Sequence, residues 1–598
     1  MDRVTIKFLT LMAVGVLSAF SESGQPVNAE TGDVDGAGAV NTDNAARRIE
    51  RSPQGIPDDY EQRRDRARGP RRNGQFNDRN VLDGLEVRTY DGTSNNVNNL
   101  EWGASFSHLQ RIGEANYSDG IASMVFSDRA GPREISNAIV QQAENESIPN
   151  SFGTSDMLWQ WGQFIDHDLD FTDGSTEEEQ NIAIPAGDQF FDPRDTGTAF
   201  SPFNRAIYDP ETGYSVNNVR QQENEITSWI DGSMIYGSDD DRAERLRNSA
   251  NRAFLAVSAG NLLPFNTQNL TNANGPVADS TSLFLAGDVR ANEQAGLTAM
   301  HTLWVREHNR LAGRLEDENP SASADRIFEA ARRLVIAKIQ KITYDEYLPA
   351  LLGDDAIPDY RSYNSSINPT VYNEFSAAAY RLGHSMVSDN VLLVGSTGEE
   401  LPQSPLELRD AFFTAPQLFS EEGGIASILR GLALNVHQRI DIKVIHTLRN
   451  LLFGPPGAGG LDLISLNIQR GRDHGLPSYN TMRVEMGLEP VTSFRQISDD
   501  EDISQSLQDA YGDVDNVDLW IGGLAETPLR NQNSQLGSLF HTIIAKQFTE
   551  LRDGDRFWYE TYLEENELRE VEGTTLTEVI RNNTTIGNEL QENVFYAQ

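Results

Sequence analysis

The sequence predicts one large, mainly α-helical domain with few short strands. Apolar residues recur at helical spacing over most of the chain after residue 80, whereas alternating apolar and polar residues are rare. The composition stays uniform from 81 to 598, without a fixed-period repeat or a region of different texture. We therefore expect a single domain over 81–598.

Helices are predicted where apolar positions recur every three or four residues, with Gly, Pro and Asn clusters such as 454–460 between them. The one candidate strand is Val391–Val394. The predicted helices are Ser155–Phe171, Ala295–Leu315, Ser323–Tyr347, Pro369–Gly383, Gly424–Arg430, Asp441–Leu452 and Leu536–Arg552.

The N-terminus has the pattern of a secretion signal. Arg3 and Lys7 precede an apolar run, Phe8–Phe20, and a polar stretch then ends in the small-x-small sequence Val27–Ala29. This predicts a cleaved signal peptide over 1–29; an uncleaved anchor is the alternative, although the run is short for a membrane span. We expect an extracellular or periplasmic protein with no membrane span.

Residues 30–80 are rich in Gly, Asp, Asn and Arg and contain few large apolar side chains. A basic cluster occupies 63–72. Such a composition cannot bury enough apolar surface to fold alone, so we predict a disordered linker or propeptide.

Composition excludes several classes of function. The 598 residues contain 49 Lys+Arg and 90 Asp+Glu, and the net charge of −41 disfavours binding to nucleic acid. The chain contains no cysteine, which rules out disulfides, a Cys nucleophile, thiolate-bound haem and iron–sulfur clusters. Metal chemistry must therefore use histidine, carboxylate and backbone oxygen.

The most unusual segment is 159–172, where a helix would place Gln163, Asp166 and His167 on one face among large apolar residues. Burying these polar groups is costly without a purpose. Asp168 would point elsewhere and need a different partner. The alternative is an amphipathic helix with a solvated acidic face.

A second segment, 227–238, offers oxygen donors at close spacing. Its side chains and carbonyl groups could surround a hard cation such as Ca²⁺, and Asp168 could complete the site. An ordinary Asp/Gly/Ser turn is the alternative. The candidate ligands in this segment are Thr227, Trp229 through its carbonyl group, Asp231 and Ser233.

Three further segments contain candidate residues. Arg290 and Glu293 lie three residues apart, just before the helix that contains His301 and His308. These two histidines are interpreted as packing or hydrogen-bonding residues, because the helix lacks the zinc-binding His-Glu-x-x-His pattern. The run 380–384 ends in Gly383–His384, where glycine leaves room for a flat group; a helix end capped by His is the alternative. The polar run 466–480 is compatible with a solvated loop.

These five segments, in this order, resemble the animal-type haem peroxidases of the peroxidase–cyclooxygenase superfamily. The resemblance rests on the motifs 162–168, 306–311 and 470–479 and extends from 90–96 to 551–560. It therefore covers nearly all of 80–598. The absence of cysteine is typical of a bacterial member.

The resemblance implies catalytic and cofactor-binding roles. His167 would be the distal base, Arg290 the distal cation, and Gln163 a hydrogen-bond donor to distal water or halide. On the proximal side, His384 would bind the haem iron and Asn467 would accept its Nδ1–H. The implied haem is derived from haem b; Arg381 and Arg470 would pair with its propionates, and Asp166 and Glu293 would form ester bonds to its methyl groups.

The resemblance also implies that Ca²⁺ binds Asp168, Thr227, Trp229, Asp231 and Ser233. Where some relatives add a sulfonium link through methionine, this chain has Gln294, so no such link is expected.

The implied function is a secreted peroxidase that reduces H₂O₂ and oxidises iodide, thiocyanate, bromide or phenols. A haem-dependent fatty-acid oxygenase is an alternative, but its radical tyrosine would lie three residues before His384, where this chain has Arg381. A non-catalytic adhesion or matrix protein is another. The sequence leaves the oligomeric state open.

Overall fold

The computed structural model describes Arg64 and residues 81–82, 84–125, 129–144, 146–414, 416–420, 423–457 and 459–598. The predicted signal peptide, 1–29, and the predicted linker, 30–80, lie outside these residues except for Arg64. Both therefore remain predictions.

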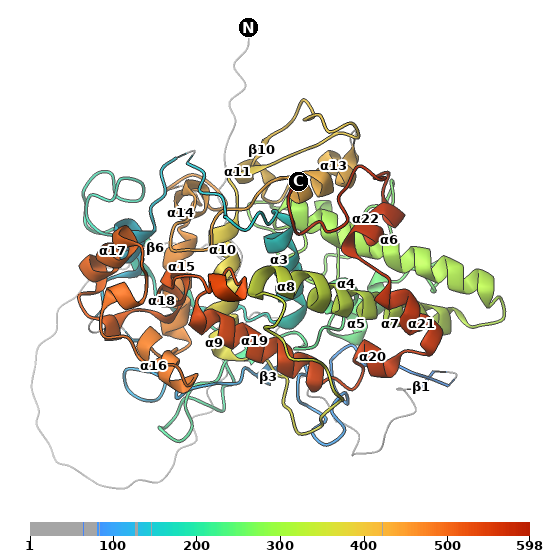
Figure 1. Cartoon of the computed structure of the whole chain (residues 1–598), viewed down its shortest axis with the longest axis horizontal. Helices are drawn as coiled ribbons and strands as arrows, with labels where there is room; N and C mark the ends of the chain where they lie inside the picture. The colour runs from blue at the N-terminus through green and yellow to red at the C-terminus, as the bar shows by residue number, and fades with distance from the viewer. Residues whose placement is uncertain are drawn as a thin grey trace, which may run out of the picture.

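Helices dominate the described chain, as the sequence predicts. The two longest are α6 (Ala295–Glu318) and α7 (Ala324–Ile342), which pack against each other. Each begins at a side chain that caps a free backbone N–H group: Gln294 accepts from Gly296 N, and Ser323 accepts from Arg326 N. Figure 1 shows this pair extending to the right of the molecule.

Some helices from the last third of the chain pack near this pair, and others form the opposite side of the molecule. In Figure 1, α15 to α18 lie on the left, α19 crosses the front, and α20 to α22 lie near α6 and α7. Their bounds are α15 Leu463–Asp473, α16 Tyr479–Glu485, α17 Glu501–Tyr511, α18 Leu519–Ala525, α19 Ser538–Asp553, α20 Tyr559–Tyr562, α21 Glu565–Glu572 and α22 Leu576–Asn583.

Helix α3 (Met157–Leu169) lies at the centre and contacts α4, α6, α10 and α13 (Gly424–Leu434). Trp161, Phe164 and Ile165 on this helix are fully buried. Because large rings fix the helix on its apolar side, its polar side chains have defined positions.

The remaining helical segments are short. They are α2 Pro132–Ile135, η2 Ser136–Val140, α4 Ser233–Tyr236, α5 Asp240–Leu246, η3 Ser280–Ser282, η4 Thr343–Tyr347, α8 Leu348–Leu352, α9 Asn373–Ser376, η5 Ala379–Leu382, α10 Gly383–Met386, α11 Leu408–Ala411, α12 Gln417–Ser420, α14 His446–Asn450, η6 Phe494–Gln496, η7 Val514–Asn516 and η8 Arg530–Gln532.

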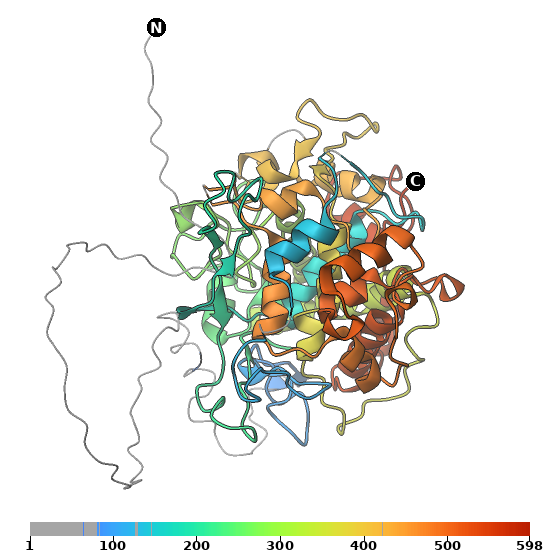
Figure 2. The same cartoon turned by 90° about the vertical axis from the view of Figure 1, so that its left-hand side faces the viewer.

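The named strands of the described chain form two-stranded antiparallel pairs: β1 with β2, β3 with β8, β4 with β7, β5 with β6, and β9 with β10. Figure 2 shows the green strands β4 to β7 together on one side of the helices. The bounds are β1 Val81–Leu82, β2 Leu85–Glu86, β3 Ser107–His108, β4 Gly174–Glu179, β5 Ile182–Ala183, β6 Phe200–Ser201, β7 Asn204–Ala206, β8 Glu223–Asn224, β9 Asn390–Val391 and β10 Leu406–Glu407.

One predicted helix, 441–452, is wrong over most of its length, and another, 369–383, is broken into short segments. In 369–383, Val371 and Asn373 bond through their backbone to Gln110, so only short helical segments form after residue 372. In 441–452, the Asp441 side chain accepts the Lys443 N–H and Val444 N bonds to the carbonyl group of residue 140. These bonds occupy backbone groups that a helix would need, so α14 begins only at residue 446.

Other local alternatives are settled by burial and dihedral angles. The run 466–480 is not a solvated loop, because its first half belongs to α15 and Asn467 and Asp473 are fully buried. Gly383 does not stop a helix: its φ of −54° is helical and α10 begins there. The strand predicted at 391–394 is shorter than expected, since β9 ends at Val391 and Val394 forms an isolated bridge.

Among the described residues, no helix combines the length and apolar character required to cross a membrane.

Candidate active site

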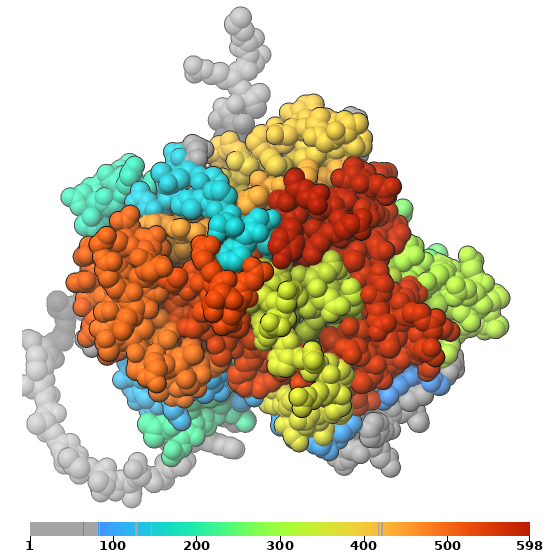
Figure 3. All heavy atoms as spheres, viewed as in Figure 1, coloured from blue at the N-terminus to red at the C-terminus, as the bar shows by residue number. Residues whose placement is uncertain are grey.

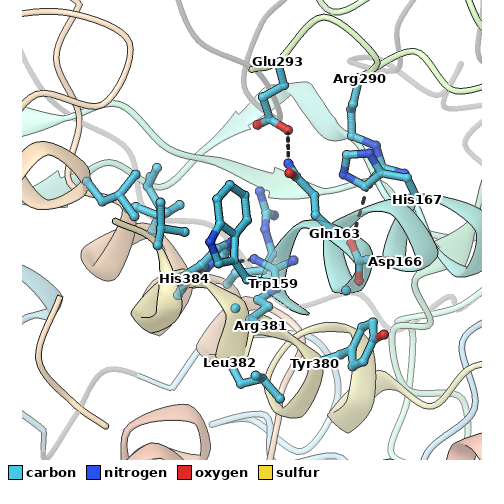
Figure 4. Close-up of a pocket in the computed structure, with 18 of the residues that line it drawn as sticks. Trp159, Gln163, Asp166, His167, Arg290, Glu293, Tyr380, Arg381, Leu382 and His384 are labelled. Atoms are coloured by element: carbon cyan, nitrogen blue, oxygen red, sulfur yellow. Dashed lines mark hydrogen bonds and ion pairs between the residues drawn. The ribbon is translucent and has the colours of Figure 1, made fainter. Parts of the chain in front are cut away.

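One cavity gathers most of the predicted site residues. Its walls come from α3, the segment before α6, the turn from η5 into α10, and α15 (Figure 4). It is lined by Gln163, Asp166, His167, Arg290, Glu293, Arg381, His384, Asn467 and Arg470, together with other residues. The predicted chemical groups therefore meet at one place, although they span about 300 positions of the chain.

His167 is a buried imidazole on α3. Burial, and then the neighbouring Arg290 charge, hold the pKa of His167 well below its ordinary value. Its Nδ1 lies 3.6 Å from Oδ1 of Asp288 and has no hydrogen-bond partner among the described residues. The ring is therefore neutral at physiological pH and can accept a proton.

Arg290 is fixed from several directions. Its guanidinium and backbone N–H donate to the Asp288 carboxylate at 2.8–2.9 Å, and Nη2 also donates to the carbonyl oxygen of Asp170 at 3.0 Å. The ring of Phe171 lies 4.7 Å from the guanidinium carbon. Burial would raise the pKa of Asp288, but Arg290 and His167 hold it below its ordinary value.

Sequence reasoning missed Asp288 as a functional residue. It lies two positions before Arg290, and its side chain is 1% exposed. The local signal was an acidic residue beside a candidate catalytic cation, but sequence cannot show that the carboxylate turns inward.

Two carboxyl groups lie beside these residues. Asp166 is 4.0 Å from Nη1 of Arg290, and burial followed by the charge of Asp170 raises its pKa well above the ordinary value. Burial also raises the pKa of Glu293 to about 7. Carboxyl groups in this environment exist partly in the neutral form at neutral pH.

A chain of glutamines orients Glu293. Gln163 Nε2 donates to Glu293 at 3.1 Å, while Gln294 Nε2 donates to the side-chain oxygens of Gln163 and Gln160 at 3.0 and 2.6 Å. Gln294 also caps α6. With its oxygen occupied by Gln294, Gln163 presents only N–H groups on its other side.

His384 lies on a different wall, at the start of α10 (Figure 4). Its Nδ1 is 2.7 Å from Nδ2 of Asn467, while Oδ1 of Asn467 accepts from Arg381 at 3.2 Å. The predicted contact is present, but with the amide nitrogen rather than the oxygen toward the ring. A half-turn of the amide exchanges the two atoms within the same space.

The cavity has the features that a flat, anionic cofactor with a metal centre requires. No described residue forms a hydrogen bond with Nε2 of His384, and a Cβ atom at Gly383 would meet nothing within 4 Å. Arg381 lines the cavity without an ion pair to a carboxylate of the described chain. Burial, and then the charge of Arg470, lower its pKa, so an added anion would relieve both penalties. The residues therefore fit haem with its propionates.

Four of the five predicted calcium ligands are joined by hydrogen bonds: Asp168, Thr227, Asp231 and Ser233. Asp168 accepts from the N–H groups of Asp231 and Gly232 at 3.1 and 3.0 Å and from the Ser233 hydroxyl at 2.7 Å. Thr227 donates to Asp231 at 3.1 Å. Burial raises the pKa of Asp168 to about 6 and, together with Asp168, that of Asp231 to about 8. Two buried carboxylates without a cationic partner at hydrogen-bond distance are suited to a hard cation.

The two histidines of α6 have the packing roles that the sequence predicts. His308 bonds through Nδ1 to the Tyr236 hydroxyl at 2.9 Å, and the His301 ring contacts Phe164 at 5.1 Å between centroids. Neither lines the cavity.

Comparison with known proteins shows the family of the chain. A family model described as animal haem peroxidase matches residues 87–595. Peroxinectin A of Dictyostelium discoideum is 36% identical over 530 residues, which cover 86% of this chain and 96% of that protein. Mouse thyroid peroxidase is 36% identical over 550 residues, or 83% of this chain, but the match spans only 60% of that longer protein.

Solved structures extend the likeness to the fold. Peroxidase A from Dictyostelium discoideum superposes with a TM-score of 0.79 at 35% identity, covering 86% of this chain and 100% of that chain. A fatty acid alpha-dioxygenase from Arabidopsis thaliana gives a TM-score of 0.70, with 85% of this chain and 83% of that chain covered. Because its identity is only 20%, it is similar in fold alone.

The Asp288–Arg290 pair leads to a stability prediction. Asp288→Asn leaves a buried guanidinium without its counter-charge, which costs about 3–5 kcal/mol. We expect the free energy of unfolding in urea to fall by about that amount, with Asp317→Asn, an exposed carboxylate on α6, as the neutral control. Equal stability of the two variants would show that the pair is not a structural anchor.

Proposed function

The chain belongs to the animal haem peroxidase family and is a haem-dependent peroxidase; on this premise we propose that His167, Arg290 and Gln163 carry its reaction with hydrogen peroxide. The observation that carries this assignment is the pairing of imidazole and guanidinium groups within one cavity. His167 lies beside Arg290 on one side, and His384 lies close to Arg381 on the other.

Each polar group has a distinct task. Haem held by His384 would supply an iron able to cleave the O–O bond of peroxide and to oxidise donors. His167, neutral because of burial, takes a proton from one peroxide oxygen and returns it to the departing oxygen. Arg290, held rigid by Asp288, stabilises the negative charge that develops between them.

On the proximal side, Asn467 would turn its amide so that Oδ1 accepts the Nδ1–H of His384. This leaves Nε2 of His384 unprotonated and directed to the metal. The same half-turn releases Arg381 from Oδ1 of Asn467, so that Arg381 and Arg470 pair with the propionates.

We assign ester bonds to Asp166 and Glu293. Both carboxyl groups line the cavity, and their raised pKa values favour the neutral acid, the form closest to an ester. Gln294 stands beside Glu293 and hydrogen-bonds to two glutamines, so no thioether is available there for a further link.

The proposed donors are iodide, thiocyanate, bromide and phenols. Arg290, Arg381 and Gln163 offer cationic groups and N–H donors to small anions inside the cavity. The net charge of −41 does not exclude anions, because salt screens surface charge beyond about 8–10 Å. Secretion into the extracellular space or the periplasm is proposed from the N-terminal pattern, in which Arg3 and Lys7 precede the apolar run Phe8–Phe20.

The fatty-acid oxygenase and the adhesion protein remain weaker alternatives. The oxygenase match is one of fold alone. A purely adhesive protein would not require a complete set of peroxidase residues in a buried cavity.

Haem ligation gives the direct test of the function. His384→Ala should lose its Soret absorbance and most of its haem after purification, because the other histidines that line the cavity, His167 and His474, lie on α3 and at the end of α15 rather than on α10. His446→Ala, which removes a half-buried histidine outside the cavity, is the control and should retain haem. Full haem occupancy in His384→Ala would refute the axial assignment.

Calcium is tested by its removal. A chelator should lower the melting temperature, and adding back Ca²⁺ at about 100 times its Kd should restore about 2.7 kcal/mol. Asp231→Asn should abolish this response because it removes one of two anionic ligands, while Asp355→Asn, on an exposed turn, should preserve it. Metal analysis that finds no Ca²⁺ in wild-type protein after Ca²⁺ is supplied would contradict the site.

Covalent attachment is tested by extraction. Acidified organic solvent should leave haem on the wild-type polypeptide, because ester bonds survive denaturation. The double variant Asp166→Ala, Glu293→Ala should release it, whereas each single variant should retain one link. Complete release of haem from the wild-type protein would exclude the esters without affecting the peroxidase assignment.

A further inference from the structure

A series of aromatic side chains extends from the cavity toward the outside of the molecule. Tyr347 and Tyr380 both line the cavity, and their hydroxyl groups are 3.1 Å apart. The ring of Tyr380 lies 5.6 Å from that of Phe548, between centroids. All three side chains are buried, so they form the inner end of the series.

The series continues through the helices that cover this side. Phe548, on α19, is 6.1 Å from the ring of Tyr344, which is 4.8 Å from Trp558. Trp558 is 2% exposed, but its ring lies 5.8 Å from that of Tyr360, whose side chain is partly exposed although its hydroxyl oxygen is buried. In Figure 3 the yellow-green segment that contains Tyr360 lies beside the red C-terminal segments on the visible face.

The outer end is suited to losing an electron together with a proton. An oxidised indole becomes a strong acid, and Nε1 of Trp558 already donates to Oε1 of Glu560 at 3.1 Å. Glu560 is exposed and can pass the proton to solvent. Tyr344, in contrast, donates to the carbonyl oxygen of Phe548, which is no base. Tyr344 would therefore conduct charge, whereas Trp558, with Glu560 as its proton acceptor, would hold it.

A second cluster of aromatic side chains near the cavity is confined to the core. Trp161, Trp304 and Phe595 contact each other or Tyr347, yet all three are fully buried. Among the described residues, no ring contact joins this group to an exposed aromatic ring.

We propose that Trp558 and Tyr360 form a second oxidation site, at which phenolic groups on molecules too large for the cavity are oxidised. Each phenol gives one electron, which passes inward through Trp558, Tyr344 and Tyr380, and one proton, which passes to solvent. Two phenols are oxidised to phenoxyl radicals while one H₂O₂ is reduced to two molecules of water. This inference rests on the proposed peroxidase function.

The substrate arm of the test uses dextran that carries 4-hydroxyphenyl groups, with the same phenol in free form and iodide as small donors. Tyr360→Phe should lose most of its turnover of the dextran phenol and keep that of both small donors. Tyr214→Phe is the matched control: Tyr214 is 71% exposed, and among the described residues its ring contacts no other aromatic ring. Equal turnover of the dextran phenol by the wild-type protein and Tyr360→Phe would overturn the proposal.

The second arm locates the radical without any donor. Peroxide is added to the haem-loaded protein with a nitroso spin trap, and the adduct is mapped by peptide mass spectrometry. We expect the adduct at Tyr360 or Trp558 and not at Tyr214, despite the greater exposure of Tyr214. Tyr344→Phe, which removes only a hydroxyl group, should reduce the adduct at Tyr360 without changing the Soret spectrum.

An adduct at Tyr214 but not at Tyr360 or Trp558 would overturn the route. Failure of the peroxidase assignment would look different, because wild-type protein would then oxidise neither iodide nor the free phenol. Oxidation of the small donors without oxidation of the dextran phenol would remove the surface site alone.

Discussion

The carboxylate of Asp168 holds the site together. It accepts three backbone N–H groups and one hydroxyl from the segment that begins α4, and so ties α3 to that segment. The residues before it on α3 then face other directions: His167 faces Asp288, and Asp166 enters the cavity. The consecutive residues Asp166, His167 and Asp168 therefore lie in three different surroundings: the cavity, the neighbourhood of Asp288, and the segment that begins α4. Loss of the Asp168 contacts would turn the helix and misplace the imidazole, although Asp168 itself touches nothing in the cavity.

Charge is distributed very differently inside and outside this protein. The chain carries −41 overall, yet Arg290, Arg381 and Arg470 line one cavity. Only Arg290 and Arg470 have carboxylate partners at short distance, Asp288 and Asp473. Arg381 has no ion pair with a carboxylate of the described residues, and the charges of Asp170 and Asp166 offset the cost of its burial only in part. This is the condition expected of a cation that binds an anionic cofactor. Small anions can reach these arginines in the cavity without additional positive charge on the surface, because salt screens the long-range repulsion from the acidic surface.

Sequence reasoning succeeded where the signal is local and failed where distant groups decide the outcome. The long helices α6 and α7 follow from periodicity and caps that lie within each segment. The helix predicted at 369–383 fails because Gln110, about 260 residues earlier, bonds to its backbone. The antiparallel pair of β4 with β7 was missed because β4 reads Gly-Ser-Thr-Glu-Glu-Glu, without apolar alternation. The site residues were found through family motifs, but the clamp by Asp288 and the hydrogen bonds of Gln294 to Gln160 and Gln163 depend on side-chain directions that no motif records.

The surroundings of Tyr380 favour a peroxidase over an oxygenase. Its ring stacks on Phe375 at 4.5 Å, and its hydroxyl donates to Tyr347. A tyrosyl radical that abstracts hydrogen from a substrate needs its oxygen free to face that substrate, whereas this oxygen already has a partner. Arg381 occupies the position three residues before His384. Its positive charge is compatible with small anionic donors but makes no favourable contact with the alkyl chain of a lipid. Ring contacts of the same Tyr380 lead away from the cavity toward Trp558, so oxidation of this tyrosine would be relayed outward rather than used on a bound lipid.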